Sequence, residues 1–303
     1  MDTRSMAVQA KKASILMQGV STELKNSALE RIANALLSRK EEILEANRQD
    51  LERSAAENLA SPLLKRLKFD EKKLNDVVEG IHSLIGLEDP VGKTLLAREL
   101  DDGLRLYRVS CPIGVIGIIF ESRPDALVQI STLCLKSGNA VLLKGGREAM
   151  LTNRILARTI SEASVKAGMP DNWINLLESR EEVNEMLALD EYVDLIIPRG
   201  SNEFVRYIMD NSRIPVLGHA DGICHVYIDR DVDVQRAVDI VVDSKTQYVA
   251  VCNALETLLV HKDSAEKVLP ALKEALEAKS VEIGGCERTR RIIACKEATE
   301  DDW

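Results

Sequence analysis

The sequence predicts an α/β protein whose main sheet is parallel and covered by helices on both faces. Short, mostly apolar segments at 115–120, 140–143 and 193–197 each end in a turn and lead into a segment with helical periodicity. Strands that are apolar throughout are typical of parallel sheets buried on both faces. An apolar content of 45% is enough for a full core, and a length of 303 residues suggests two domains.

The chain before residue 87 is predicted to be helical. Apolar residues between 29 and 37 keep the three-and-four spacing of an amphipathic helix. Ser38-Arg-Lys-Glu41 has the form of a capping box and predicts the start of a second helix. Asp70 is expected to cap a third helix. The alternating segment 104–109 follows a loop at 88–92 and predicts an exposed strand.

Helices are predicted to follow the apolar strands, starting near Asp125, Glu148 and Ser201, and 216–217 and 224–228 are expected to be further strands. A second unit is predicted to contain a helix at 234–242, a strand at 255–260 and a helix at 264–277. The expected domains are therefore residues 1–222 and residues 223–303.

Composition excludes several classes of function. A net charge of −9 and an aromatic content of 3% argue against nucleic-acid binding, which needs basic surfaces and stacking platforms. No apolar run approaches the roughly 18 residues of a membrane span, and the first residues lack the apolar core of a signal peptide. The scattered cysteines and histidines lack metal-ligand spacing, so no metal is expected. We therefore expect a cytoplasmic protein that binds neither membrane nor nucleic acid.

Three polar segments follow predicted strands. Lys144-Gly145-Gly146-Arg147 combines two glycines, two cations and a helix start, which suits a phosphate or ribose, although a tight turn with solvated charges explains it equally well. Gly200-Ser201 repeats this arrangement, and ordinary helix capping by Ser201 is the simpler explanation. Arg123 follows the strand at 115–119 and can bind a carboxylate or phosphate, or a surface glutamate.

Two residues of the second half can carry proton transfer or nucleophilic chemistry. His219 lies between two apolar segments, where it can transfer protons or belong to a structural network. Cys252 lies between a helical segment and the strand at 255–260, and its spacing indicates a nucleophile presented at a cleft. A buried thiol is the alternative. A nearby cation such as Lys245, a helix N-terminus or a cofactor can activate such a cysteine.

Five segments, taken in order, resemble the gamma-glutamyl phosphate reductase family of the aldehyde dehydrogenase superfamily. The resemblance runs from the helical N-terminal region to near residue 303, and several motifs in one order are more specific than any one. The segments are 114–124 (GVIGIIFESRP), 135–146 (LKSGNAVLLKGG), 197–202 (IPRGSN), 215–227 (PVLGHADGICHVY) and 252–260 (CNALETLLV).

The resemblance implies an aldehyde dehydrogenase-like fold, with a Rossmann-like cofactor domain and an α/β catalytic domain that is shorter here. It also implies reduction of L-glutamate 5-phosphate to L-glutamate 5-semialdehyde by NADPH, with release of phosphate, in proline biosynthesis. Cys252 matches the family's catalytic cysteine, and Lys144 matches the superfamily's cofactor-ribose lysine. Gly200 and Ser201 fall at the superfamily's cofactor loop.

The remaining site residues follow from this resemblance. Ser122 falls where many aldehyde dehydrogenases have their oxyanion asparagine, and Asn253 is a second candidate donor to the oxyanion. Arg123, Lys245 and Arg199 are expected anion partners, and His219 lies near the substrate. At Leu217-Gly-His219 the chain lacks the glutamate with which aldehyde-oxidising relatives activate water, which suits a reductase.

Family members continue for roughly a hundred further residues, so the catalytic domain is expected to be incomplete here. Two rival functions therefore stay open. One is a catalytically silent truncated or cofactor-binding module, which would bind NADPH without turnover. The other is a different acylating aldehyde dehydrogenase, which would prefer another acyl donor. The strand near 104–110 predicts a homodimer or higher homo-oligomer, because exposed strands seek a partner edge. Functional pairing with glutamate 5-kinase is also expected.

Overall fold

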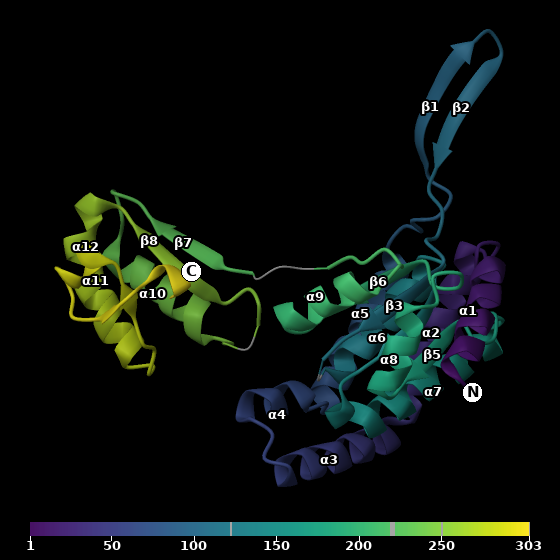
Figure 1. Ribbon diagram of the computed structural model, residues 1–303, viewed down its shortest axis with the longest axis horizontal. Helices are drawn as coiled ribbons and strands as arrows, with labels where there is room; N and C mark the ends of the chain where they lie inside the picture. The colour runs from purple at the N-terminus through teal and green to yellow at the C-terminus, as the bar shows by residue number, and fades with distance from the viewer. Residues whose placement is uncertain (122, 219–221, 250, 303) are drawn as a thin grey trace. The chain divides into compact units, whose positions relative to one another are not determined.

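The chain folds into two units, each built around its own sheet (Figure 1). The computed structural model describes residues 1–121, 123–218, 222–249 and 251–302. Backbone contacts separate Met1–His219 from Ala220–Trp303. No helix in these described ranges is both long enough and apolar enough to cross a bilayer.

The sheet of the first unit is parallel, with strand order β5-β4-β3-β6 in the described part of the chain. Every residue of β3 is buried, as are the first four of β4, because helices cover both faces. The predicted strands at 115, 140 and 193 are confirmed, whereas β5 was not predicted. Val216 contributes a single parallel bridge to Ile196 rather than a strand. The bounds are β3 (Val115–Ile119), β4 (Ala140–Lys144), β5 (Ile174–Leu177) and β6 (Leu195–Pro198).

Helices surround this sheet and supply most of the buried core of the first unit. The predicted helical N-terminal region is confirmed. The helices are α1 (Thr3–Met17), α2 (Thr22–Ser38), α3 (Lys40–Ala56), α4 (Ser61–Leu67), α5 (Glu71–Gly86), α6 (Pro124–Lys136), α7 (Met150–Ala167), α8 (Arg180–Leu187) and α9 (Asn202–Asn211), with a 3₁₀ turn η1 (Arg147–Ala149) before α7.

One of the two predicted caps in this region is wrong. Ser38 is the last residue of α2, and its hydroxyl donates to the carbonyl oxygen of Ala35 at 2.9 Å. Arg39 precedes α3 without a side-chain cap. Because α2 runs almost directly into α3, no extended residue is left to act as a cap, and the serine bonds back into its own helix. Asp70 caps α5 as predicted, accepting from the Lys73 amide at 3.1 Å.

Strands β1 (Thr94–Asp101) and β2 (Leu104–Val109) form an antiparallel hairpin. Every residue of both strands is exposed, and within the described chain the two strands pair only with each other. Gly103 takes a φ of +76° in the connecting turn, a conformation that glycine adopts without strain. The exposed strand predicted at 104–109 is thus confirmed. Its large apolar side chains are open to solvent: Leu95, Leu96, Leu100, Leu104, Leu106, Tyr107 and Val109.

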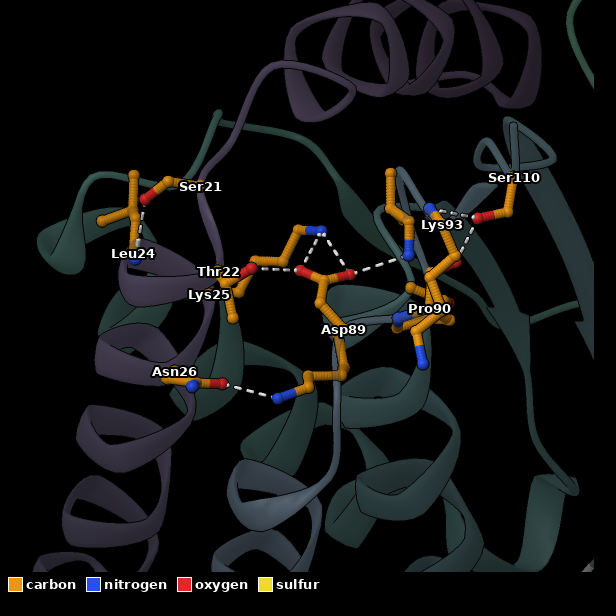
Figure 2. Close-up of polar contacts among 12 residues, drawn as sticks. Ser21, Thr22, Leu24, Lys25, Asn26, Asp89, Pro90, Lys93 and Ser110 are labelled. Atoms are coloured by element: carbon orange, nitrogen blue, oxygen red, sulfur yellow. Dashed lines mark hydrogen bonds and ion pairs between the residues drawn. The ribbon is translucent and has the colours of Figure 1, made fainter. Parts of the chain in front are cut away.

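A polar network holds the root of this hairpin against α2 (Figure 2). The ammonium group of Lys25, whose side chain is only 2% exposed, lies 2.9 Å from a carboxylate oxygen of Asp89. The same carboxylate accepts from the Thr22 hydroxyl and the Val91 amide, each at 2.9 Å. Ser110, directly after β2, donates to the carbonyl oxygen of Pro90 at 2.6 Å. Asp89 therefore fixes the chain that enters the hairpin to α2, and Ser110 ties the returning chain to that same segment.

The second unit has a parallel pair of strands, β7 and β8, packed against two helices. The predicted helices and strand of this unit are confirmed, with α10 extending four residues further than expected. The bounds are β7 (Cys224–Ile228), α10 (Val234–Thr246), β8 (Leu255–Val260), α11 (Lys262–Glu277), β9 (Gly284–Gly285), α12 (Glu287–Arg290), β10 (Lys296–Glu297) and the 3₁₀ turn η2 (Glu300–Asp302).

Candidate active site

The carboxyl edge of the first sheet gathers three of the segments that the sequence singles out. The strand register places Lys144 and Pro198 on either side of Ile119. The Phe120 amide donates to the carbonyl oxygen of Lys144 at 2.9 Å, and the Arg199 amide donates to that of Ile119 at 2.8 Å. The chain thus leaves three neighbouring strands at one edge, which is where open parallel sheets bind ligands.

Lys144 is half-buried at this edge. Its ammonium group donates to the carbonyl oxygen of Gly145 at 2.5 Å. Burial lowers the pKa of Lys144, because desolvation disfavours the charged amine, while nearby Glu148 opposes this effect. Among the described residues, the carbonyl of Gly145 is the hydrogen-bond partner of this amine, and a ligand hydroxyl or anion can take that place.

The two glycines after Lys144 differ in the atoms that surround them. A Cβ on Gly145 would clash with the Asn153 amide nitrogen and lie 3.1 Å from the Phe120 ring, so close packing alone requires glycine there. A Cβ on Gly146 would clash with the carboxylate of Glu148. Beside these glycines lies a small hollow lined by Gly145, Gly146, Arg147, Met150, Asn153, Leu176, Leu177 and Glu178. The Glu148 carboxylate therefore lies against the backbone at Gly146.

The N-terminus of α7 is not open to a ligand, contrary to the expectation for this segment. The fully buried carboxylate of Asp50, on α3, accepts from the Thr152 amide and hydroxyl, both at 2.8 Å. It also accepts from the Leu151 amide at 3.3 Å and is paired with Arg53 at 2.7 Å. An anion from the protein itself already occupies the helix start. The cofactor contacts expected of Lys144, Gly145 and Gly146 stay predictions.

Gly200 and Ser201 follow β6 as predicted, and Ser201 caps α9. Its hydroxyl accepts from the Phe204 amide at 3.3 Å. This is the ordinary capping function that the sequence also allowed. The cofactor contact expected of Gly200 and Ser201 stays a prediction.

The loop after β3 carries Arg123, which is half-buried at the start of α6, while Arg199 is exposed beyond β6. The Arg123 amide donates to the carbonyl oxygen of Glu121 at 2.6 Å. Ser122 and His219 lie outside the described residues. The anion-binding assignments of both arginines stay predictions.

Cys252 is exposed in the turn between α10 and β8. Its carbonyl oxygen accepts from the Cys224 thiol at 3.4 Å, and a Cβ on Gly222 would lie 3.2 Å from that same oxygen. The backbone of Cys252 therefore rests on the start of β7 while its thiol reaches solvent. Asn253 is also exposed, and Lys245 is half-buried in the last turn of α10.

The exposure of Cys252 distinguishes it from Cys134. Cys134 is buried inside α6, and burial raises the pKa of its thiol to about 12. A thiol with such a pKa supplies almost no thiolate near neutral pH, so it is not a nucleophile. The buried-thiol alternative considered for Cys252 is wrong.

Sequence reasoning missed two groups at these sites. Asp50 has no local signal, because an acidic residue on an amphipathic helix is usually solvated. Cys224 sits in one of the quoted motifs, yet its contact with Cys252 joins residues that are 28 positions apart. The β7–β8 pairing is what brings the two cysteines together.

Comparison with known proteins agrees with this architecture. The chain matches the aldehyde dehydrogenase family over residues 2–290. It is 69% identical over all 303 residues to the gamma-glutamyl phosphate reductase of Acetivibrio thermocellus, covering 70% of that protein. The gamma-glutamyl phosphate reductase structure from Thermotoga maritima superposes with a TM-score of 0.92 at 38% identity, covering 100% of this chain and 74% of that one.

The Saccharomyces cerevisiae gamma-glutamyl phosphate reductase structure gives a TM-score of 0.68 at 41% identity, covering 96% of this chain and 73% of that one. The chain spans about 70% of the length of the curated relatives that it matches. The expected family and the expected α/β fold class are both confirmed. The chain belongs to the aldehyde dehydrogenase family and, within it, to the gamma-glutamyl phosphate reductases.

Proposed function

We propose that this chain reduces L-glutamate 5-phosphate to L-glutamate 5-semialdehyde with NADPH and releases phosphate, a step of proline biosynthesis. The observation that carries the proposal is the 69% identity to a gamma-glutamyl phosphate reductase across the entire chain. An exposed cysteine at the position of the family's nucleophile supports it. We place the reaction in the cytoplasm. We also propose functional pairing with glutamate 5-kinase, because an acyl phosphate hydrolyses readily and is best used close to the enzyme that makes it.

The proposed chemistry begins at Cys252. Its thiolate forms a bond to the acyl carbon, the bond from that carbon to the phosphate oxygen breaks, and the acyl group is held as a thioester. NADPH, when bound, supplies the hydride that reduces the thioester. The tetrahedral adduct then expels the Cys252 thiolate and releases the aldehyde. The backbone N–H of Cys252 and the Asn253 side chain are the proposed donors to the developing oxyanion, with Ser122 as a further candidate.

The residues at the sheet edge fit a nicotinamide cofactor, which the family uses. Lys144 can donate to a ribose hydroxyl in place of the carbonyl oxygen of Gly145. Arg147 is exposed beside the hollow, and Lys144 and Arg147 face the carboxylates of Glu148 and Glu178 there. The choice of NADPH over NADH rests on the family resemblance.

Lys144→Ala is expected to weaken NADPH binding by about 10- to 100-fold, the range for losing one hydrogen bond from a charged donor. Fluorescence titration of NADPH measures the change. Lys40→Ala is the matched control, because Lys40 pairs with Glu71 on the protein surface and its side chain is 33% exposed. Equal NADPH affinity in the native chain and the Lys144 variant would remove Lys144 from the cofactor site.

The function is tested in the reverse direction, which avoids the labile acyl phosphate. The chain is mixed with L-glutamate 5-semialdehyde, NADP⁺ and inorganic phosphate, and formation of NADPH is followed. Activity that requires phosphate supports the proposal. Faster turnover with coenzyme A in place of phosphate would favour another acylating aldehyde dehydrogenase. Binding of NADPH without turnover in the folded chain would favour a silent cofactor-binding module.

We also propose that the β1–β2 hairpin joins two or more copies of this chain. A two-stranded ribbon with exposed leucines is marginal in water and gains stability from a second surface. Leu104→Asp with Leu106→Asp, on one face of β2, is expected to shift sedimentation to the monomer. Arg105→Ala, on the opposite face, is the control. A native chain that sediments as a monomer at every concentration would contradict this assignment.

A further inference from the structure

Two cysteines lie together where β7 and β8 begin in the second unit (Figure 1). The Cys224 thiol donates to the carbonyl oxygen of Cys252 at 3.4 Å, so its sulfur touches the same residue that carries the second thiol. Cys252 is exposed and Cys224 is half-buried. An oxidant in solution therefore reaches Cys252 first, with a second thiol directly beside it.

The backbones that carry the two thiols also run close together. A Cβ on Gly222 would lie 3.9 Å from the Cβ of Cys252. Cys224 pairs with Leu255, which follows Cys252 closely at the start of β8. A disulfide needs Cα atoms within about 7 Å of each other, and neighbouring segments of this kind are where such distances occur.

The regular part of the strand pair begins only after these cysteines. Cys252 lies in a turn that the Ala254 amide closes by donating to the carbonyl oxygen of Val251 at 3.3 Å, which is long for such a bond. The β7–β8 register is irregular between Cys224 and His225. Rotation of the two cysteine side chains with a small shift of the turn therefore leaves the regular ladder intact.

The other two cysteines of this unit form a useful contrast. Cys286 is exposed, and its hydrogen bonds with Thr289 lower the pKa of its thiol, which favours the reactive thiolate. The nearest described thiol to that segment is Cys295, whose sulfur lies 2.6 Å from the position of a Cβ on Gly285. Cys286 thus reports ordinary oxidation of an exposed thiol in the same unit as Cys252.

We propose that Cys224 and Cys252 are a redox pair, in which Cys224 captures oxidised Cys252 as a disulfide. The oxidant is a hydroperoxide. The Cys252 thiolate attacks its terminal oxygen, the O–O bond breaks, and the departing alkoxide or hydroxide takes up a proton, which leaves Cys252 as a sulfenic acid. The Cys224 thiolate then attacks that sulfur, the S–O bond breaks, and the hydroxide that leaves becomes water. The two sulfurs lose two electrons, which the hydroperoxide gains.

The disulfide protects Cys252 from further oxidation. A sulfenic acid without a partner thiol proceeds to sulfinic acid, which is irreversible for most proteins. A disulfide instead returns to two thiols by exchange with a dithiol, which becomes oxidised in turn. The benefit of sparing Cys252 rests on the proposed function, since Cys252 is the proposed nucleophile. Formation of the disulfide does not, because it requires no turnover.

Peptide mass spectrometry tests the pair directly. The folded chain is treated with hydrogen peroxide, its remaining thiols are blocked with iodoacetamide, and it is digested without reductant. A peptide pair linked through Cys224 and Cys252 is expected as the main oxidised form of Cys252. In Cys224→Ser this link is absent, and sulfinic acid at Cys252 is expected to rise about 10-fold or more.

The variants separate loss of the sulfur from loss of structure. Cys224→Ser keeps a hydroxyl that can donate to the Cys252 carbonyl oxygen, so it removes the sulfur and spares the contact. Cys286→Ser is the control and should form the 224–252 link as the native chain does. Dithiothreitol should release the linked peptides in both the native chain and this control.

Recovery of activity provides a second measurement. After peroxide treatment and then dithiothreitol, the native chain should regain most of its own untreated rate of phosphate-dependent NADP⁺ reduction. Cys224→Ser, compared with its own untreated rate, is expected to recover about 10-fold less, because sulfinic acid resists a dithiol. A protective role for Cys224 predicts this difference only after oxidation.

Three results of the peptide experiment would overturn the redox pair. They are equal sulfinic acid at Cys252 in the native chain and Cys224→Ser, a disulfide from Cys252 to Cys286 or Cys295, and a Cys252 that peroxide leaves unmodified while Cys286 is oxidised. A native chain that shows no turnover before peroxide would count against the reductase function, whereas the linked peptide would still decide the pairing.

Discussion

Cys252→Ala is expected to lower the rate of phosphate-dependent NADP⁺ reduction by about 10⁴-fold or more, as for other enzymes that lose their nucleophile. Without the thiolate no thioester forms. The substrate carbon that accepts the hydride, or donates it in the reverse direction, is then not held in place. The structure supports this choice of nucleophile, because Cys252 is exposed in a turn whereas Cys134 is buried with a raised pKa.

Two measurements make this expectation specific. Cys111→Ala, which removes another exposed cysteine, should leave the rate unchanged. In the native chain, iodoacetamide should modify Cys252 faster than Cys134 or Cys224, as read by peptide mass spectrometry. Retention of more than a tenth of the activity in Cys252→Ala would place the nucleophile elsewhere, with Cys224 the nearest other thiol on the described chain.

Asp89→Asn is expected to lower the free energy of unfolding by about 3–5 kcal/mol, the usual cost of removing one partner from a buried ion pair. The Lys25 side chain is 2% exposed and that of Asp89 is 12% exposed, so the lysine would keep its charge with little water nearby. Urea denaturation measures the change. Glu88→Gln is the control, because Glu88 pairs with Lys93 while 84% exposed, and exposed pairs contribute about 1 kcal/mol or less. A similar small loss in both variants would contradict the expectation.

The carboxylate of Asp89 also makes the free energy of unfolding depend on pH. Burial by itself raises the pKa of Asp89, but the Val91 amide, the Lys25 ammonium and the Thr22 hydroxyl outweigh burial and lower it below 3.8. Because the folded-state pKa lies below the unfolded one, Asp89 contributes stability above pH 3.8 and loses it as the pH falls through the folded value. Asp89→Asn should therefore lose less stability than the native chain over this acidic range.

Local patterns predicted the elements that depend on local physics. Val115–Ile119 is apolar and buried throughout, and so are the first four residues of β4. Strand β5 (Ile174–Leu177) was missed because it has only four residues, of which two are half-buried. Ser38 failed as a cap because its neighbour helices meet almost without a gap, which the capping-box spacing does not reveal.

The candidate site was predictable only as separate segments. The motifs identified Lys144, Gly200 and Cys252, and the strand register explains why the first two lie at one sheet edge. Contacts between distant residues had no signal in the sequence. Asp50 meets Thr152 and Arg66 meets Glu121 only because α3 and α4 fold back over the sheet edge.

Because the buried carboxylate of Asp50 stabilises the start of α7, the turn at residues 144–147 does not have to. In many nucleotide-binding folds one glycine-rich turn both starts a helix and holds the ligand's phosphate, so a change in one task disturbs the other. Here α3 supplies the anion that stabilises the start of α7, so that stabilisation does not depend on residues 144–147 or on a ligand bound to them. If residues 144–147 bind the cofactor as proposed, substitutions there can alter which cofactor is preferred without weakening the start of α7. Cofactor preference and helix stability can then change independently during evolution.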